Sequence, residues 1–284
     1  MKLLSTANPK IQKGTKLGYL SFILHLAPAD LSGKETCPKR TAGCTAACLN
    51  TAGRGGMFRR GENTNVIQQA RIRKTKLFFN DRDTFMEQLE QDINLGIKQA
   101  ARLGLTPVFR LNGTSDLAWE KYTCKGSDRN IFEMFDNIQF YDYTKLPKPW
   151  LRTKPNYHLT FSYSERSSWA EVEACLAHGI NVAVVFDRLK GDDLPTTFAG
   201  VRVIDGDTHD LRFLDPDSLQ ETGRVTVRDD KGPVVRLNEL EVVEGVAQRE
   251  AERLSTETSV PVLGAEPNRQ FRRVVWHRTV PQAD

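Results

Sequence analysis

Short apolar runs, rich in β-branched and aromatic residues, recur along the first two thirds of the chain. They predict six buried strands separated by helical or irregular connections. Their ranges are 17–27, 107–112, 138–143, 158–162, 181–186 and 201–204. Strands that alternate with helical connections favour a parallel sheet with right-handed crossovers.

Four segments between these strands carry apolar residues at helical spacing. They cover residues 66–79, 85–103, 130–135 and 168–178. In the second segment Phe85, Leu89, Ile93 and Ile97 fall on one face, which predicts a helix packed against the sheet. We expect Ser167 to cap the last helix, since its hydroxyl can accept a hydrogen bond from a free backbone N–H.

This order of elements predicts an α/β fold of the TIM type, as a partial parallel β/α barrel of about six strands spanning residues 1–216. An open doubly wound sheet is the alternative. Residues 217–284 differ, because they combine a hairpin signal around 229–232 with a charged helical stretch at 239–254. They predict a small C-terminal α+β appendage.

Composition narrows the class of protein. The chain has 284 residues, of which 39% are hydrophobic and 27% charged, enough for a sizeable core and unlike a disordered or fibrous chain. No apolar run reaches the roughly 18 residues that a membrane span needs, and no signal-peptide core is present. We therefore expect a cytoplasmic protein with no membrane partner, whose cysteines are thiols or metal ligands.

The net charge of +4 conceals a strongly basic segment between residues 37 and 79, in which the only acid is Glu62. Such a segment can bind the phosphates of DNA, RNA or a nucleotide. The basic residues predicted to do so are Arg54, Arg59, Arg60, Arg71, Arg73 and Lys74. The alternative is a solvated face balanced by the acids between residues 81 and 92.

Polar residues follow the predicted strands. In parallel β/α folds the loops after the strands form the active site. The candidate ligand-binding residues there are Asn112, Thr114, Ser115, Asp116, Ser162, Ser164 and Glu165. Candidates for nucleophilic or acid–base catalysis are Asp116, Asp142, Asp207 and His209. A hydrogen-bonded loop histidine is an equal interpretation of His209, and Arg110, if buried, requires a carboxylate partner.

Three of the five cysteines, Cys37, Cys44 and Cys48, fall within one short segment after the first predicted strand. Thiolates at this density favour zinc or an iron–sulfur cluster. A structural zinc needs a fourth ligand, which His25 or Cys124 could supply. Three ligands with one open position fit a [4Fe–4S] cluster better, and three cysteines without a metal remain the third interpretation.

The sequence resembles a phage protein family named after gene product 88 of a mycobacteriophage. The resemblance rests on PADLSG at 28–33, the three cysteines, LNTAGRG at 49–55 and RLNGTSD at 110–116, and it continues through FYDYTK at 140–145. It implies phage or prophage origin and carries no activity with it.

A second resemblance is more informative about chemistry. The cysteines are separated by six and then three residues, and the chain has Asn-x-x-Ser-Asp at 112–116 and Tyr-Thr-Lys at 143–145. This is similar to a phage-associated family related to radical S-adenosylmethionine enzymes, whose cysteines are separated by six and then two. The chain departs from the usual spacing of three and then two, and has Ala47 where an aromatic residue usually stands.

This second resemblance implies a [4Fe–4S] cluster on Cys37, Cys44 and Cys48 that binds S-adenosylmethionine. It assigns the methionyl amine to Thr114, Ser115 and Asp116, and the ribose to Ser162, Ser164 or Glu165. Cleavage of the sulfonium would give a 5′-deoxyadenosyl radical that abstracts hydrogen from a nucleic acid or nucleotide.

Two other functions stay open. The first is a base-modifying enzyme resembling the tRNA-guanine or DNA-deazaguanine transglycosylases, which use paired Asp residues beside a structural zinc. The Asp-Ser-Gly-Gly turn of those enzymes is absent from this sequence. The second is a non-catalytic, zinc-stapled protein whose basic face binds DNA or RNA.

Overall fold

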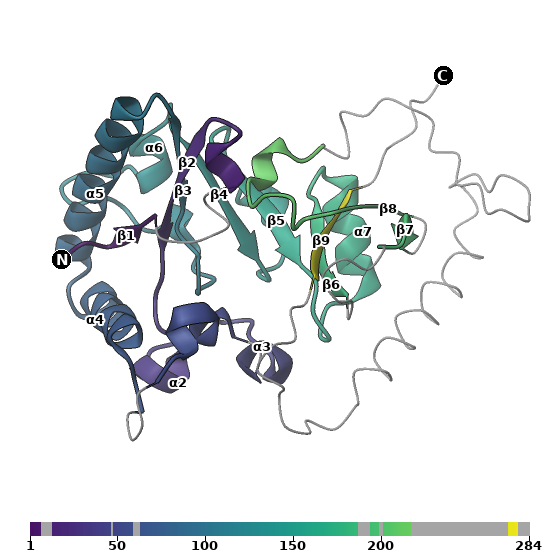
Figure 1. Ribbon diagram of the computed structural model, residues 1–284, viewed down its shortest axis with the longest axis horizontal. Helices are drawn as coiled ribbons and strands as arrows, with labels where there is room; N and C mark the ends of the chain where they lie inside the picture. The colour runs from purple at the N-terminus through teal and green to yellow at the C-terminus, as the bar shows by residue number, and fades with distance from the viewer. Residues whose placement is uncertain are drawn as a thin grey trace, which may run out of the picture. The chain divides into compact units, whose positions relative to one another are not determined.

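The computed structural model describes residues 1–6, 13–46, 48–58, 63–186, 194–198, 201–216 and 272–277 (Figure 1). The fold is mixed α/β and divides into two compact units. The first unit comprises Met1–Thr160 and His209–Leu214, and the second comprises Phe161–Thr208 and the chain from Asp215 onward. No helix within the described ranges is long and apolar enough to span a membrane.

The first unit holds most of the described elements. Its strands are β1 (Leu4–Ser5), β2 (Tyr19–Leu24), β3 (Thr106–Arg110), β4 (Gln139–Thr144) and the first part of β5 (Tyr157–Ser162). Its helices are α2 (Ala29–Ser32), α3 (Ala42–Ala46), α4 (Val66–Asn80), α5 (Arg82–Arg102) and α6 (Ile131–Met134). Its 3-10 turns are η1 (Leu49–Thr51), η2 (Gly53–Gly56), η3 (Trp119–Lys121), η4 (Pro149–Leu151) and η5 (Arg212–Leu214).

The sheet of the first unit runs in the order β1-β2-β3-β4-β5. Strands β2, β3 and β4 are parallel, with Phe22 opposite Phe109 and Phe109 opposite Phe140, whereas β1 pairs antiparallel to β2. The predicted strands are confirmed, although β2 is shorter than expected. It begins at Tyr19, because Gly18 adopts a positive φ of 85° that ends the preceding turn.

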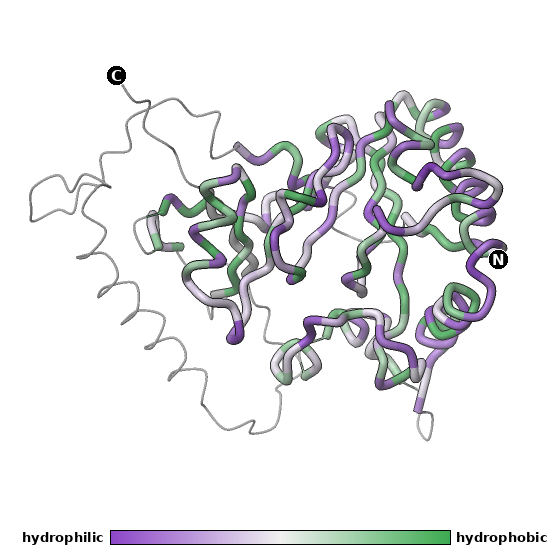
Figure 2. Tube along the Cα trace, turned by 180° about the vertical axis from the view of Figure 1, so that it is seen from behind, coloured by the Kyte–Doolittle hydropathy of each residue, from purple (hydrophilic) through white to green (hydrophobic). Residues whose placement is uncertain are grey.

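Helices α4 and α5 are also confirmed, and each begins at a side-chain cap. The Asn65 side chain accepts from the Gln68 N–H, and the Asp81 side chain accepts from the Thr84 N–H. Figure 1 shows α5 beside β2 and β3, and Figure 2 shows hydrophobic and hydrophilic residues alternating along it. Its apolar stripe is buried as predicted, with Phe85, Leu89 and Ile93 fully covered.

The two sides of this sheet have different chemistry. On the helix side, Phe22, Phe109 and Phe140 pack in sequence and join the core formed with α5. On the other side, which we call the inner side, Val108 and Tyr141 pack against Leu211 of the returning segment His209–Leu214. Side chains alternate along a strand, so each strand contributes to both sides.

The second unit contains α7 (Trp169–Ala177), β6 (Val182–Phe186), β7 (Thr197–Phe198), β8 (Val201–Ile204) and β9 (Arg272–His277). Its strands follow the order β5-β6-β9-β8-β7, with β6 parallel to β5. Helix α7 begins with a capping box at Ser168, one residue later than the predicted cap. The Ser167 hydroxyl instead accepts from the Ser164 N–H.

The predicted sixth strand forms at the expected residues as β8, but its pairing differs from the prediction. It is not hydrogen-bonded to β6, because β9 lies between them and is antiparallel to both. Of the appendage predicted at 217–284, only β9 is described. The hairpin around 229–232 and the helix at 239–254 lie outside the described residues.

Candidate functional site

The turn after β3 is built around the Asn112 side chain. Its Oδ1 accepts three hydrogen bonds, from the Ser115 hydroxyl, the Leu117 N–H and the Trp119 indole N–H, at 2.9 to 3.0 Å. Its Nδ2 donates to the Leu117 carbonyl. Asn112 and Ser115, both predicted to bind a cofactor, thus hold the turn in one conformation.

Asp116 ends this turn and is buried. Its carboxylate accepts from the Thr144 hydroxyl and the Lys145 N–H, each at 2.7 Å, which ties the β3 turn to the end of β4. Burial raises the pKa of Asp116, while the bond from the Lys145 N–H opposes that rise. The carboxylate is therefore held by two donors, and each of its oxygens keeps capacity for a further one.

Cys37 lies against the same turn. Its Sγ is 3.8 Å from the Thr114 carbonyl oxygen, and the Thr114 hydroxyl donates to the Leu26 carbonyl after β2. Burial raises the pKa of the Cys37 thiol to about 12, and the charge of Asp116 adds to the effect. The first cysteine of the predicted cluster thus sits at the carboxyl edge of the parallel strands.

The two other cysteines follow on the same loop. Cys44 lies in α3, where its N–H donates to the Thr41 hydroxyl, and Cys48 precedes η1. Both are partly exposed, and none of the five cysteines forms a disulfide. The charge of Cys48 contributes to the raised pKa of Cys37, so these two thiols lie within range of each other's field.

Helix α4 holds the loop that follows the cysteines. Asn65 donates to the Arg54, Gly55 and Met57 carbonyls, and Arg71 donates to the backbone and side-chain oxygens of Asn50. Gly55 is required here, since a Cβ would lie 2.4 Å from the Asn50 carbonyl oxygen. The glycines of this run therefore let η2 pack closely on η1, where Asn50 is bonded by Arg71 of α4.

His25 stands where β2 ends, beside Gly113 of the next turn. A Cβ at position 113 would lie 2.6 Å from the His25 Nδ1, so glycine lets the ring approach the turn. The Nδ1 is buried and makes no hydrogen bond. Burial, followed by the charges of Arg71 and Arg110, lowers the pKa of His25 to about 3, which leaves its ring neutral.

Arg110 is buried on the inner side of the sheet, and the structure shows that the carboxylate paired with it is Asp210. The Arg110 Nη1 lies 2.8 Å from the Asp210 Oδ2, and the guanidinium stacks 4.8 Å from the Tyr143 ring centre. Burial lowers the pKa of Arg110, but the charge of Asp210, together with those of Tyr143, Tyr141 and Asp142, raises it above the usual range.

Asp142, a predicted catalytic residue, lies on the helix side with no exposed surface. Its Oδ1 accepts from the Asn112 N–H at 2.7 Å, and its Oδ2 accepts from the Tyr157 hydroxyl at 3.3 Å. Burial raises its pKa to about 7, against the opposing charge of Arg110. These contacts give Asp142 a role in joining β3, β4 and β5.

The predicted nucleic-acid contacts divide into two groups. Arg54 and Arg73 are exposed, whereas the Lys74 ammonium is buried and donates to the Leu3 carbonyl. Burial lowers the pKa of Lys74 to about 8. Arg71 is held by Asn50, and Arg59 and Arg60 lie outside the described residues.

The remaining predicted residues fall in separate places. Ser162, Ser164, Glu165 and Asp207 belong to the second unit, where Ser164 contacts Ser167 and the Asp207 N–H donates to Asp205. His209 belongs to the first unit, and its Nδ1 accepts from the Leu211 N–H. That bond matches the hydrogen-bonded loop histidine, one of the two interpretations of His209.

A family comparison places the chain among known sequences. The model of the gene product 88 family matches residues 2–236. The chain belongs to the gene product 88 family. The matched range includes the cysteine loop, the β3 turn and Arg110. No curated protein and no solved structure matched the chain.

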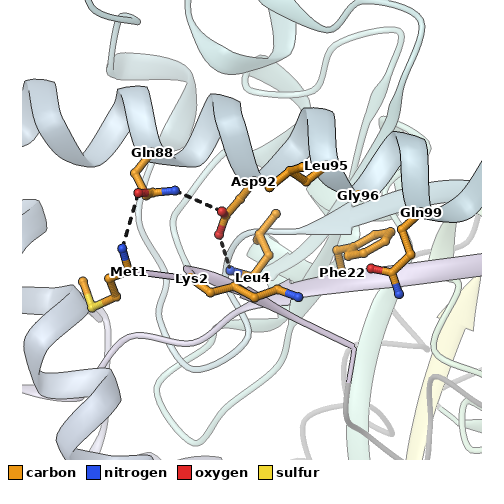
Figure 3. A pocket seen from close by; sticks show the side chains of 9 residues that line it. All are labelled: Met1, Lys2, Leu4, Phe22, Gln88, Asp92, Leu95, Gly96 and Gln99. Carbon is orange, nitrogen blue, oxygen red and sulfur yellow. Dashed lines mark hydrogen bonds between the residues drawn. The ribbon is translucent and has the colours of Figure 1, made fainter.

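This gene product 88 protein also has a pocket of about 240 Å³ between β1 and α5. Figure 3 shows Gln88 and Asp92 reaching from α5 towards the N-terminal residues. The Asp92 carboxylate accepts from the Leu3 and Leu4 N–H groups, and Gln88 accepts from the terminal amine. None of the predicted site residues lines this pocket, whose polar groups fasten β1 to α5.

Sequence reasoning missed several residues that shape the site. Arg152 pairs with both oxygens of Glu120 and donates to the Thr144 hydroxyl, which in turn donates to Asp116. Asp210 was not singled out as the partner of Arg110. A buried basic residue needs an acid, but the sequence does not say which of the chain's 36 acidic residues folds next to it.

Proposed function

We propose that this gene product 88 protein is a metalloenzyme that binds an iron–sulfur cluster through Cys37, Cys44 and Cys48 and modifies a nucleic acid or nucleotide. The observation that carries the proposal is the contact of Cys37 Sγ with Thr114 at the carboxyl edge of parallel strands. Reactive centres of parallel β/α folds occupy this edge.

The donor set fits such a cluster in type. Three thiols on one loop, none of them in a disulfide, match the ligands that iron–sulfur clusters use. Within the described ranges no three His, Cys, Asp or Glu side chains are gathered at metal-binding distance. Cluster binding would therefore have to draw Cys44 and Cys48 towards Cys37, while α4 keeps the following loop in place.

When bound, such a cluster supplies an electron that splits S-adenosylmethionine into methionine and a 5′-deoxyadenosyl radical, with the electron coming from an external reductant. Asn112 and Ser115 fix the β3 turn. The Asp116 carboxylate, near Cys37, can accept a hydrogen bond from the methionyl amine of S-adenosylmethionine. We also propose that the strands form a partial parallel barrel, and that the protein acts in the cytoplasm, where thiols stay reduced.

The basic face would bring the nucleic acid to this edge. Only the exposed residues of the described set, Arg54 and Arg73, can contact phosphates without breaking internal bonds. Replacing both with Gln should weaken binding of single-stranded DNA or RNA and flatten its salt dependence. Lys98→Gln, an exposed lysine on α5, is the matched control and should leave binding unchanged.

Metal analysis tests the proposal most directly. Protein purified and reconstituted without oxygen should contain about four irons per chain and absorb in the thiolate-to-iron region. The cluster should be lost in each of the variants Cys37→Ser, Cys44→Ser and Cys48→Ser. The control variant Cys175→Ala, at a buried position of α7, should retain the cluster.

Release of 5′-deoxyadenosine from S-adenosylmethionine after addition of dithionite would then demonstrate the chemistry. Absence of iron in the wild-type protein would overturn the proposal. Stoichiometric zinc on the same cysteines would favour the transglycosylase-like or the non-catalytic binding function instead.

A further inference from the structure

The Arg110 guanidinium uses little of its hydrogen-bonding capacity. It carries five N–H donors, and its one hydrogen bond is from Nη1 to Asp210 Oδ2 at 2.8 Å. Its Nε is buried without a hydrogen bond, and its ion pair with Asp142 Oδ1 is long, at 4.0 Å. A buried arginine held by a single bond leaves the paired donors of its planar group available for an oxyanion.

Other groups of the first unit indicate that a ligand belongs on the inner side. Thr160 has no exposed surface, and its hydroxyl makes no hydrogen bond. The Nδ1 of the His25 ring, beside Gly113, is also buried without a hydrogen bond. Buried polar groups are normally paired, so the unused donors of Arg110 and Thr160 favour a ligand that carries acceptor oxygens.

The inner side is covered by the short segment His209–Leu214. Leu211 packs against Val108 and Tyr141, and the Phe213 ring lies 5.4 Å from that of Tyr19. Figure 1 shows this segment, in light green, on the side of β3 and β4 away from α5. The backbone bonds from the Leu211, Arg212 and Leu214 N–H groups stay within the segment. Its contacts with the strands include the apolar packing of Leu211 and the Asp210–Arg110 ion pair.

We propose that Arg110 anchors an oxyanion group of a ligand, phosphoryl or carboxylate, and that Asp210 is the internal carboxylate that occupies this position until the ligand displaces it. Binding then lifts His209–Leu214 from the inner side and exposes the polar side chains beneath it. The ligand gains two parallel N–H···O bonds in place of one.

The proposal does not depend on a metal. It places the oxyanion on β3 two residues before Asn112, next to the turn that contacts Cys37. A nucleotide phosphate held there would lie beside the cysteine loop, but the anion site can be tested on protein without any cluster.

Hydrogen exchange on the wild-type protein is the first test. Inorganic phosphate, compared with chloride at equal ionic strength, should speed exchange of the amides in His209–Leu214 and slow exchange in β3. Acetate tests the carboxylate alternative in the same way. The anion with the larger effect on exchange shows whether the site prefers a phosphoryl or a carboxylate group. Unchanged or slower exchange in the segment with both anions would overturn the proposal.

Variants of Asp210 give the second test. Asp210→Asn removes the competing carboxylate, so phosphate should bind about tenfold more tightly than to the wild type, because the free state of Arg110 becomes populated. The double variant Arg110→Met with Asp210→Asn should bind no phosphate, because the guanidinium is gone. The Asp210→Asn change is included so that no unpaired carboxylate is left buried. Equal affinity of Asp210→Asn and wild type, or binding by the double variant, would contradict the displacement.

Discussion

The two sides of the first unit's sheet are made by the same strands and are buried to a similar extent, yet they differ in kind. The helix side stacks aromatic rings, with Phe22 and Phe109 5.1 Å apart and Phe109 and Phe140 5.7 Å apart. On the inner side the Arg110 guanidinium stacks on the Tyr143 ring, and the Tyr141 hydroxyl donates a hydrogen bond to the Ser21 hydroxyl. Stability alone accounts for the first side.

The difference teaches where function should be sought. A polar surface buried under a short segment is costly unless each group is paired, and the inner side leaves Arg110 Nε and the Thr160 hydroxyl without hydrogen bonds. An apolar interior would avoid that cost. We therefore interpret the helix side as the part that folds the unit, and the inner side as the part that binds.

The strongest way to break the helix side is to remove a stacked ring. Phe109→Ala should lower the free energy of unfolding by about 3 to 5 kcal/mol, because it leaves a cavity between Phe22 and Phe140. Urea denaturation measures the effect. Leu103→Ala, at an exposed position beyond α5, is the control and should change little.

The inner side should respond to charge more than to volume. Arg110→Met should cost about 3 kcal/mol, since it strands the buried Asp210 carboxylate. Adding Asp210→Leu should recover most of the loss, because both members of the pair are then apolar. If the double variant is as unstable as the single one, the arginine stabilises the unit through packing and the comparison fails.

Asp142, which bonds the Asn112 N–H and the Tyr157 hydroxyl on the helix side, predicts that stability depends on pH. Its pKa is raised from 3.8 to about 7, so the folded state holds more protons than the unfolded state in that range. Stability from this group is present at low pH and is lost as pH rises towards 7. The free energy of unfolding of Asp142→Asn, relative to that of the wild type, should therefore rise by more than about 1 kcal/mol between pH 4 and pH 7. Denaturation of both proteins in parallel at each pH measures this difference. A constant difference across that range would contradict the raised pKa.

The smallest expected effect comes from a single hydroxyl. Thr160→Val removes a buried group without a hydrogen bond, so stability should stay the same or rise by about 0.5 to 1 kcal/mol. Thr75→Val is the matched control on α4, where the hydroxyl bonds the Ala27 N–H and the Arg71 carbonyl. That control should lose stability, and an equal loss in Thr160→Val would mean that the Thr160 hydroxyl is satisfied.

Much of the fold could be predicted because its signals are local. The apolar spacing of α5 and the β-branched run of β6 depend on neighbours within a few residues, and both formed as expected. The pairing of β8 could not be predicted in this way. A strand from near the end of the chain, β9, pairs between β8 and β6, and no pattern within residues 201–204 specifies its partner.

The candidate site shows the same limit. The Asn112–Asp116 turn and the cysteine loop were found because they combine turn residues with chemical groups over a short stretch. Lys74 was placed on a basic face, although its ammonium is buried against Leu3. Charge in a sequence does not distinguish a solvated side chain from one that bonds a distant backbone carbonyl, and only the fold brings residues 3 and 74 together.

The return of His209–Leu214 to the first unit has a consequence for synthesis of the chain. Arg110 and Asp210 are 100 residues apart, so the ribosome completes β6 and β8 before the acid that pairs with Arg110 emerges. Contacts of such long sequence separation close late, because the entropy of loop closure must be overcome first. The helix side can assemble early from nearby residues, while the inner side stays hydrated until the segment docks, and in the finished protein it is the part of the first unit expected to open most readily.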